Sequence, residues 1–199
     1  KALDLGCAVG RSSFELAKYF QHVDAVDFSA RFIQQGVKLQ SSNRLRYTLP
    51  VEGDIAEYRE VLLDKMGYDD VKDRTQFLQG DACNLKPELT DYNVVFAGNL
   101  IDRLYEPKLF LDSITQRILS GGLLVLTSPY TWLEEYTDKE NWLGGIKVNG
   151  ENFSTLDALK LHLGELFEFE DARDVPFVIR ETARKYQHTN AQMSIWRKK

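Results

Sequence analysis

The chain has few of the residues that stabilise secreted proteins or bind metals. Its 199 residues include only 2 cysteines and 3 histidines. Cys7 and Cys83 do not form the disulfide framework of a secreted protein, so we expect a reducing, cytoplasmic environment in which both are small structural thiols. No group of His, Cys, Asp and Glu residues has the spacing of metal ligands, and we therefore expect no metal site.

An excess of positive charge and long apolar runs are also lacking. The 25 Lys and Arg residues are outnumbered by 30 Asp and Glu residues, which gives a formal net charge of −5. No basic cluster is interleaved with aromatic residues, and this argues against DNA or RNA as a partner. No apolar run is long enough for a bilayer span, and no signal peptide is visible. With 43% hydrophobic residues and no repeat or linker, residues 1–199 predict one well-buried domain.

The first residues predict a strand, a glycine turn and a helix in immediate succession. Asp4 lies in a short apolar run, and Gly6 and Gly10 follow it at a spacing that allows the backbone to turn sharply and approach a ligand. Apolar residues at helical spacing come next, so a helix N-terminus would face that ligand. The third glycine of a dinucleotide-binding turn would stand at position 11, which is Arg11. The pattern Asp4-x-Gly6-x-Ala8-x-Gly10 resembles instead the turn of class I AdoMet-dependent methyltransferases.

Three further apolar segments end in polar residues. Residues 23–29 predict a strand that ends at Asp27, 17 residues beyond Gly10, where a carboxylate can accept hydrogen bonds from both hydroxyls of a ribose. Residues 77–82 predict a strand followed by Gly80-Asp81-Ala82, and residues 94–100 a strand followed by Asn99 and Leu100. An isolated acid at a strand end is usually a solvated turn residue, but four such signals in this order favour a ligand site.

The rest of the chain supplies the helices and the last strands. Helices are predicted from residue 30 to 40, with Phe32, Ile33, Val37 and Leu39 near one face, from Pro107 through Ile118, and after a Ser154/Asp157 cap. Ser120-Gly121-Gly122 would close the second of these before a strand at 123–127. Residues 175–181 and 192–197 predict an antiparallel pair, and residues 45–63 a β-hairpin excursion around a turn at 52–54.

The order of these elements resembles the class I methyltransferase fold. This resemblance implies an α/β, Rossmann-like architecture with a seven-stranded sheet, a C-terminal antiparallel hairpin and helices on both faces. It implies S-adenosylmethionine as cofactor, with Asp27 on the ribose and Asp81 on the adenine amino group. The cofactor-binding residues expected on this basis are Asp4, Gly6, Cys7, Ala8, Gly10, Asp27, Phe28, Asp81, Ala82, Asn99 and Leu100.

A narrower resemblance rests on blocks along the chain, several of which, notably SPYTWLEE and VPFVIRETARKYQH, are not generic methyltransferase motifs. LDLGCAVGRSSFELA, FLQGDACNLKP, NLIDRLYEP, GGLLVLTSPYTWLEEYT and DVPFVIRETARKYQH are similar to the C-terminal methyltransferase domain of the ovothiol-biosynthesis enzyme, the mercaptohistidine N-methyltransferase family. The likeness covers nearly all of the chain, and the family shares the departure from the usual turn at Ala8. It implies N-methylation of an imidazole, and as partner an upstream iron-dependent sulfoxide synthase domain in the same polypeptide. We therefore expect the chain to be a fragment of a longer, bifunctional protein.

Methyl transfer to an imidazole requires alignment and a hydrogen-bonded tautomer more than it requires a strong base. Polar residues after the fourth and fifth strands are candidates for holding the acceptor ring, and charged residues of the tail are candidates for holding its amino-acid head group. The catalytic candidates are Asn99, Asp102 and Tyr130. The substrate-binding candidates are Arg103, Tyr130, Trp132, Arg180, Glu181, Arg184 and Tyr186. For each tail residue alone, a surface ion pair or ring packing is an equal alternative.

Two other functions fit the same cofactor half-site. One is methyl transfer to a different small molecule or to a protein side chain. The other is a non-catalytic AdoMet-binding module that docks or regulates a neighbouring domain.

Overall fold

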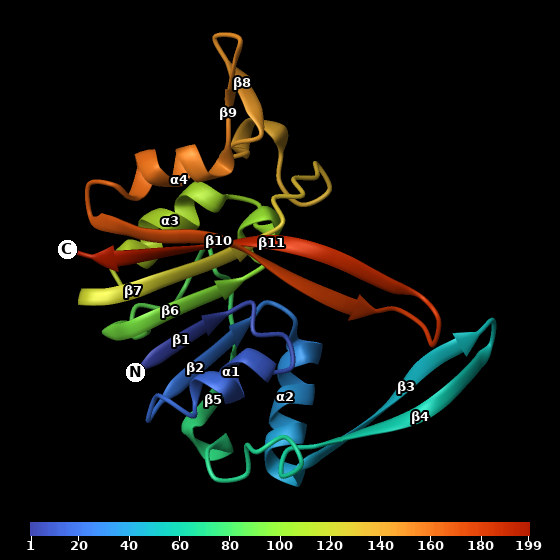
Figure 1. The fold of residues 1–199 in the computed structure, drawn as a ribbon. Coiled ribbons are helices and arrows are strands. Elements are labelled where there is room, and N and C mark those ends of the chain that lie inside the picture. The colour runs from blue at the N-terminus through green and yellow to red at the C-terminus, as the bar shows by residue number, and fades with distance from the viewer.

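The computed structural model describes all residues, Lys1–Lys199, and its centre is a seven-stranded mixed sheet (Figure 1). The strand order is β10-β11-β7-β6-β1-β2-β5. Five strands are parallel, and β11 and β10 are antiparallel additions at one edge. The predicted fold class is thus confirmed. The bounds are β1 Ala2–Leu5, β2 Val23–Asp27, β5 Thr75–Gln79, β6 Tyr92–Gly98, β7 Ile118–Ser128, β10 Phe167–Arg180 and β11 Tyr186–Lys198.

The helices lie on both faces of this sheet. α1 (Arg11–Leu16) and α2 (Ala30–Ser42) cover one face, and α3 (Pro107–Thr115) and α4 (Thr155–Leu163) cover the other (Figure 1). This division follows from the right-handed crossovers, because the chain runs outward from β1 to β5 and then outward from β6 in the opposite direction. The largest apolar cluster lies under α3 and α4 and includes the fully buried Trp196. The longest helix has 13 residues, and none combines the length and apolarity that a membrane crossing needs.

Two helix starts are fixed by side chains, and the second of these caps was predicted from the sequence. The Ser29 hydroxyl accepts a hydrogen bond from the Phe32 amide at the start of α2. Ser154 and Asp157 form a reciprocal capping box at the start of α4, which satisfies backbone donors that would otherwise lack partners.

The ends of several helices differ from the predictions. α1 has six residues, and the segment that contains the buried Ala17 lies beyond its end. α3 ends at Thr115, and residues 118–122, predicted as its last turn and its stop, belong to β7. Gly121 and Gly122 lie within β7, near the point where its pairing with β6 shifts register between Tyr92 and Val94.

The buried face of α2 also differs from the prediction. Ile33, Gly36 and Leu39 are buried, whereas Phe32 and Val37 are exposed. Gly36 is on the buried face because the Phe77 ring occupies the space that a side chain would need: an added Cβ would lie 2.6 Å from that ring. The periodicity therefore predicted the helix and two of its buried residues, Ile33 and Leu39, but not the position of Phe32 and Val37.

Two long hairpins project from the domain on the side where the parallel strands end (Figure 1). One, β3 (Arg44–Glu52) and β4 (Ile55–Leu62), is the predicted excursion. The other is β10–β11, which is longer than predicted: Gln192 pairs with the last residue of β7, and β11 extends six residues farther out. The Ala183 amide at the tip of β10–β11 donates to the Pro50 carbonyl of β3 at 3.0 Å.

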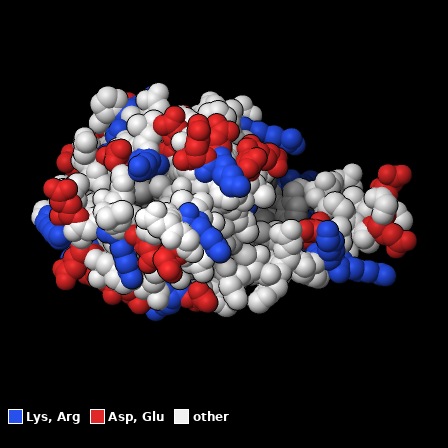
Figure 2. All heavy atoms as spheres, turned by 90° about the horizontal axis from the view of Figure 1, so that it is seen from above, with Lys and Arg blue, Asp and Glu red and all other residues white.

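Three 3-10 turns and a short third hairpin complete the fold. The turns are η1 (Lys72–Arg74), η2 (Ile101–Arg103) and η3 (Lys139–Asn141), and the hairpin is β8 (Ile146–Val148) with β9 (Glu151–Phe153). On the face seen in Figure 2, basic and acidic side chains are interspersed, and the projecting hairpins carry charge mainly near their ends.

Candidate cofactor and acceptor site

The glycine turn is held against β2 by its own backbone. The amides of Gly6 and Cys7 both donate to the Val26 carbonyl, at 2.9 and 3.1 Å, and the Gly10 amide donates to the Cys7 carbonyl at 2.8 Å. Gly6, Ala8 and Gly10 have positive φ angles of 72°, 49° and 94°. A turn with three left-handed residues needs glycine or a small side chain, which explains the predicted spacing and makes Ala8 the one strained position.

Gly10 is required by packing as well as by its backbone. A Cβ at this position would lie 2.4 Å from the ring of Phe77, which comes from β5. Phe77 also packs edge-to-face on Phe14 of α1, with ring centroids 5.7 Å apart. The turn is therefore fixed from behind by an aromatic cluster that cannot move without opening the core.

Asp4 supports the turn from within the protein. Its carboxylate is 1% exposed and accepts hydrogen bonds from the hydroxyls of Ser12 and Ser13 at 2.7 and 2.5 Å. Burial, opposed by these two hydrogen bonds and reinforced by the nearby charge of Asp27, raises the pKa of Asp4 to about 6. Asp4 ties the first turn of α1 to β1 and does not line a cavity.

Asp27, the last residue of β2, is held by backbone amides on both of its oxygens. Its Oδ2 accepts from the Ala8 amide at 2.9 Å and its Oδ1 from the Ser29 amide at 2.8 Å. These bonds fix the carboxylate between the glycine turn and α2 and leave lone pairs on both oxygens. The next residue, Phe28, is 78% exposed and presents a free aromatic face beside it.

A cavity of about 330 Å³ opens in front of these groups, at the carboxyl ends of β1, β2 and β5. Its size is at the lower end of the range for small-molecule sites. Predicted residues contribute about half of its wall, and the predictions missed Val26, Gly80, Leu104, Tyr105, Glu135 and Tyr136. The lining residues are Gly6, Val26, Asp27, Phe28, Gly80, Asp81, Ala82, Leu100, Arg103, Leu104, Tyr105, Glu135 and Tyr136.

Asp81 lines the same cavity, two residues beyond the end of β5. Its Oδ1 accepts from the Cys83 amide at 2.8 Å and its Oδ2 from the Tyr105 hydroxyl at 2.8 Å. The hydrogen bond to Asp81 raises the pKa of Tyr105 to about 12, so the phenol remains a donor at neutral pH. Burial raises the pKa of the Cys83 thiol to about 11 and raises that of Cys7 further, so both are structural thiols.

Asn99 and Tyr130 follow β6 and β7 and share a left-handed backbone, each with φ 52°. The Asn99 amide donates to the Thr127 carbonyl, and its side-chain oxygen accepts from the Thr127 hydroxyl at 3.1 Å. The Tyr130 hydroxyl donates to Oε1 of Gln192 at 3.2 Å. Burial, with a further contribution from the charge of Asp102, raises the pKa of Tyr130 to about 12. Gln192 was not identified from the sequence as the partner of Tyr130, because the two residues are 62 positions apart.

Asp102 joins the two loops that carry these residues. It is fully buried, its Oδ1 accepts from the Ser128 hydroxyl, and its Oδ2 accepts from both the amide and the hydroxyl of Thr131 at 2.9 to 3.0 Å. Arg103 forms an ion pair with Oδ2 at 2.9 Å and also bonds the Thr131 carbonyl. The structure thus makes Asp102 a positioning residue, because neither of its oxygens faces the cavity.

The structure does not bring the tail candidates to Tyr130. Trp132 is buried, and its indole N–H donates to the Thr155 hydroxyl at 2.9 Å, under α4. Tyr186 lies six residues beyond Gln192 along β11, which is roughly 20 Å of strand. At this tip, Arg180 bonds the Thr182 carbonyl and lies over the ring of Tyr186, Glu181 pairs with Lys185 at 2.5 Å, and Arg184 is exposed.

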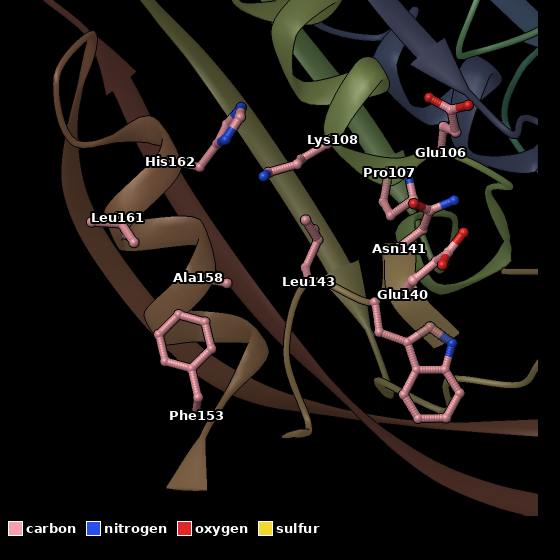
Figure 3. A pocket seen from close by; sticks show the side chains of 11 residues that line it. Glu106, Pro107, Lys108, Glu140, Asn141, Leu143, Phe153, Ala158, Leu161 and His162 are labelled. Atoms are coloured by element: carbon pink, nitrogen blue, oxygen red, sulfur yellow. The ribbon is translucent and has the colours of Figure 1, made fainter. Parts of the chain in front are cut away.

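A second cavity, of about 530 Å³, lies between the start of α3, α4 and the η3 segment (Figure 3). Glu106, Pro107 and Asn141 line its side nearest the first cavity. The segment 104–107 separates the two cavities, because its first residues line one and its last residues line the other. Neither contains a group of three or more His, Cys, Asp and Glu side chains that could hold a metal ion.

Comparisons with known proteins agree with this geometry. Residues 3–126 match a family model described as a methyltransferase domain, whereas no curated protein matches the sequence. A SAM-dependent methyltransferase from Methanosarcina mazei superposes with a TM-score of 0.62 at 17% identity, over 99% of this chain and 91% of that one. The N-methyltransferase NodS from Bradyrhizobium japonicum, solved with S-adenosyl-L-homocysteine, gives 0.59 at 12% identity, over 99% and 76% of the two chains.

The match to the family model covers more than half of the chain and includes the glycine turn, Asp27, Asp81 and the end of β6. The residues around the first cavity fit the cofactor of this fold, since a glycine cradle, a fixed carboxylate and an exposed aromatic face lie side by side along its wall. The chain therefore belongs to the methyltransferase domain family and is a class I methyltransferase that uses S-adenosylmethionine.

Proposed function

We propose that this methyltransferase transfers the methyl group to an imidazole nitrogen of mercaptohistidine. The observation that best supports this proposal is that sequence blocks similar to the ovothiol family lie next to the cofactor cavity. SPYTWLEEYT, residues 128–137, begins at the end of β7 with Tyr130 and then supplies Glu135 and Tyr136 to the cofactor cavity. NLIDRLYEP, residues 99–107, supplies the opposite wall. Two of the blocks that carry the resemblance to the ovothiol family thus contribute to the wall of the cofactor cavity, and this placement supports the proposal.

The cofactor half of the site would use groups that the fold already holds in place. Asp27 would bind the ribose hydroxyls, Asp81 the adenine amino group, and Phe28 and Leu100 the faces of the ring. The free backbone edge of the Gly6–Gly10 turn would face the methionyl part. When bound, S-adenosylmethionine supplies an electrophilic methyl group on a positively charged sulfur.

The protein's own contribution on the acceptor side is orientation. Oδ1 of Asn99 is occupied by Thr127, so its side-chain amide N–H groups are available to a thiolate or a ring nitrogen. The Tyr130 phenol, held by Gln192 and protonated at neutral pH, is a hydrogen-bonding group and not a base. Both groups can fix the imidazole tautomer whose lone pair points at the methyl group, and alignment of this kind provides much of the rate enhancement in such reactions.

The direct test is to incubate the protein with S-adenosylmethionine and mercaptohistidine and to look for an N-methylated product by mass spectrometry. Tyr130→Phe should lower kcat with little effect on cofactor affinity, and Tyr19→Phe, an exposed tyrosine on the α1 side, is the matched control. Methylation of a different acceptor would identify another substrate. Cofactor binding without transfer to any thiol-imidazole would instead favour a binding module.

The proposed substrate also defines a partner. Mercaptohistidine must be formed by an enzyme that couples sulfur to histidine, and the family resemblance places a sulfoxide synthase domain in that role, in the same polypeptide. The longer protein, expressed whole, should then convert histidine and cysteine to a methylated product in the presence of S-adenosylmethionine and iron.

A further inference from the structure

The two oxygens of Asp81 have different partners. The residue opens a tight turn in which the Asn84 amide donates to the Asp81 carbonyl at 3.0 Å and the Cys83 amide donates to Oδ1 at 2.8 Å. Oδ1 is therefore committed to the local turn. Oδ2 is the oxygen left for a partner from outside, and the Tyr105 hydroxyl occupies it at 2.8 Å.

Tyr105 reaches this oxygen from a wall of the same cavity. Its side chain is half-exposed, and it lies in the short segment between η2 and α3. A hydrogen bond to a carboxylate is stronger than one between neutral groups, and its effect is visible in the raised pKa of Tyr105. Inside the cavity, Oδ2 of Asp81 thus already accepts one hydrogen bond, from a side chain that lines the same cavity.

The segment that carries Tyr105 has space on both sides. Behind it, Nδ2 of Asn141 donates to the Tyr105 carbonyl at 3.3 Å, and the following residues, Glu106 and Pro107, face the 530 Å³ cavity (Figure 3). The Tyr105 side chain is half-exposed, so it can turn toward solvent while the buried Leu104 before it and Pro107 after it keep their places. Tyr105 can therefore withdraw from Asp81 at small cost.

We propose that Tyr105 is a latch that competes with the adenine amino group for Oδ2 of Asp81 and thereby sets both the affinity and the base specificity of cofactor binding. Only a ligand with a hydrogen-bond donor at C6 of its purine can replace the phenol in the same bond. The exchange is one hydrogen bond for another, with no covalent step. The proposal rests on the assignment of Asp81 to adenine in the proposed function.

The test is calorimetric titration of S-adenosylhomocysteine into the wild type and Tyr105→Phe. If only a fraction of the protein has Oδ2 of Asp81 free of Tyr105, the apparent affinity is the intrinsic affinity multiplied by that fraction. Removal of the phenol hydroxyl should therefore tighten binding roughly three- to tenfold and raise the association rate. Tyr19→Phe is the matched control, because Tyr19 is exposed on the α1 side, does not line the cavity, and its hydroxyl makes no hydrogen bond; its affinity should stay at the wild-type value. S-inosylhomocysteine, whose C6 oxygen cannot donate to a carboxylate, should show no gain in Tyr105→Phe.

Unchanged or weaker binding of S-adenosylhomocysteine to Tyr105→Phe would overturn the latch. The expected result is a gain in affinity, which a folding defect cannot produce. Asp81→Ala separates this failure from that of the site. If Asp81→Ala binds normally, adenine lies elsewhere and both assignments fail. If Asp81→Ala binds weakly and Tyr105→Phe binds as the wild type does, Asp81 holds adenine and only the latch is refuted. None of these measurements depends on the methyl acceptor.

Discussion

The cofactor side and the acceptor side of the site are assembled from different kinds of contact. Gly6, Asp27 and Asp81 all lie within two residues of the end of a parallel strand, and each is fixed by backbone amides close to it in space. On the acceptor side, Tyr130 depends on Gln192 from an antiparallel strand, and its loop depends on the buried Asp102. The cofactor side is therefore set by local chain geometry, whereas the acceptor side is set by tertiary contacts and can vary while the fold is kept.

The largest loss of AdoMet affinity is expected at Gly10, and it tests whether the glycine turn belongs to the cofactor side. Gly10→Val places a branched side chain at φ 94° and against the ring of Phe77. We expect AdoMet binding to fall by roughly a thousandfold, about 4 kcal/mol, measured by calorimetry. Gly121→Ala is the control. Gly121 also has a positive φ, 78°, but a Cβ added there would have no atom within 4 Å, so this variant reports backbone strain without a steric clash. Wild-type affinity in Gly10→Val would show that the turn is not the cradle.

The next effect concerns pH and the support of the turn. The pKa of Asp4 is raised to about 6 in the folded protein, above its ordinary value of 3.8, so the folded state binds more protons between these values. Asp4 therefore contributes stability that is present below about pH 4 and is lost as the pH rises through 6. The loss is at most about 3 kcal/mol, from a shift of roughly two pH units.

Asp4→Asn removes this titration. The free energy of urea unfolding, measured for both proteins at pH 4 and pH 7, should fall more for the wild type than for Asp4→Asn over that interval. Parallel pH profiles would mean that the carboxyl group has the same pKa in the folded and unfolded chains.

A smaller effect is expected from Asp27→Ala, which removes the acceptor for the ribose and for the Ala8 amide. The loss of charge-assisted hydrogen bonds should weaken AdoMet binding by about 2 kcal/mol, roughly 30-fold. Asp54→Ala in the exposed turn between β3 and β4 is the control of equal charge. An unchanged dissociation constant for Asp27→Ala would remove the end of β2 from the cofactor site.

The smallest effect should come from the hairpin tip. Arg180→Met keeps the apolar stem, and because the tip lies roughly 20 Å of strand beyond Gln192, KM for mercaptohistidine and AdoMet affinity should both stay within about twofold of the wild type. Arg184→Met should behave in the same way. A clear rise in KM with unchanged AdoMet affinity would show that the hairpin closes over the acceptor, and the acceptor side would then extend to the tail.

The sequence was sufficient wherever a short stretch decides the structure. Alternating and buried strands, the turn glycines and the Ser154/Asp157 cap are local patterns, and the strand order follows from them through the handedness of the crossovers. It was insufficient where a residue's role depends on a distant partner. Tyr105 and Gln192 carry no local signal, and Trp132, an attractive substrate contact in sequence, instead fills the core beside Thr155.

The tips of the two long hairpins, β3–β4 and β10–β11, are in direct contact. Pro50 accepts the hydrogen bond from Ala183 but has no amide N–H to return, so the tips share a single backbone hydrogen bond. Such a bond is worth about 1 kcal/mol, and at room temperature a tie of that strength is broken roughly one time in six. The two hairpins are therefore joined by one weak tie, and their tips can separate while the seven-stranded sheet stays intact.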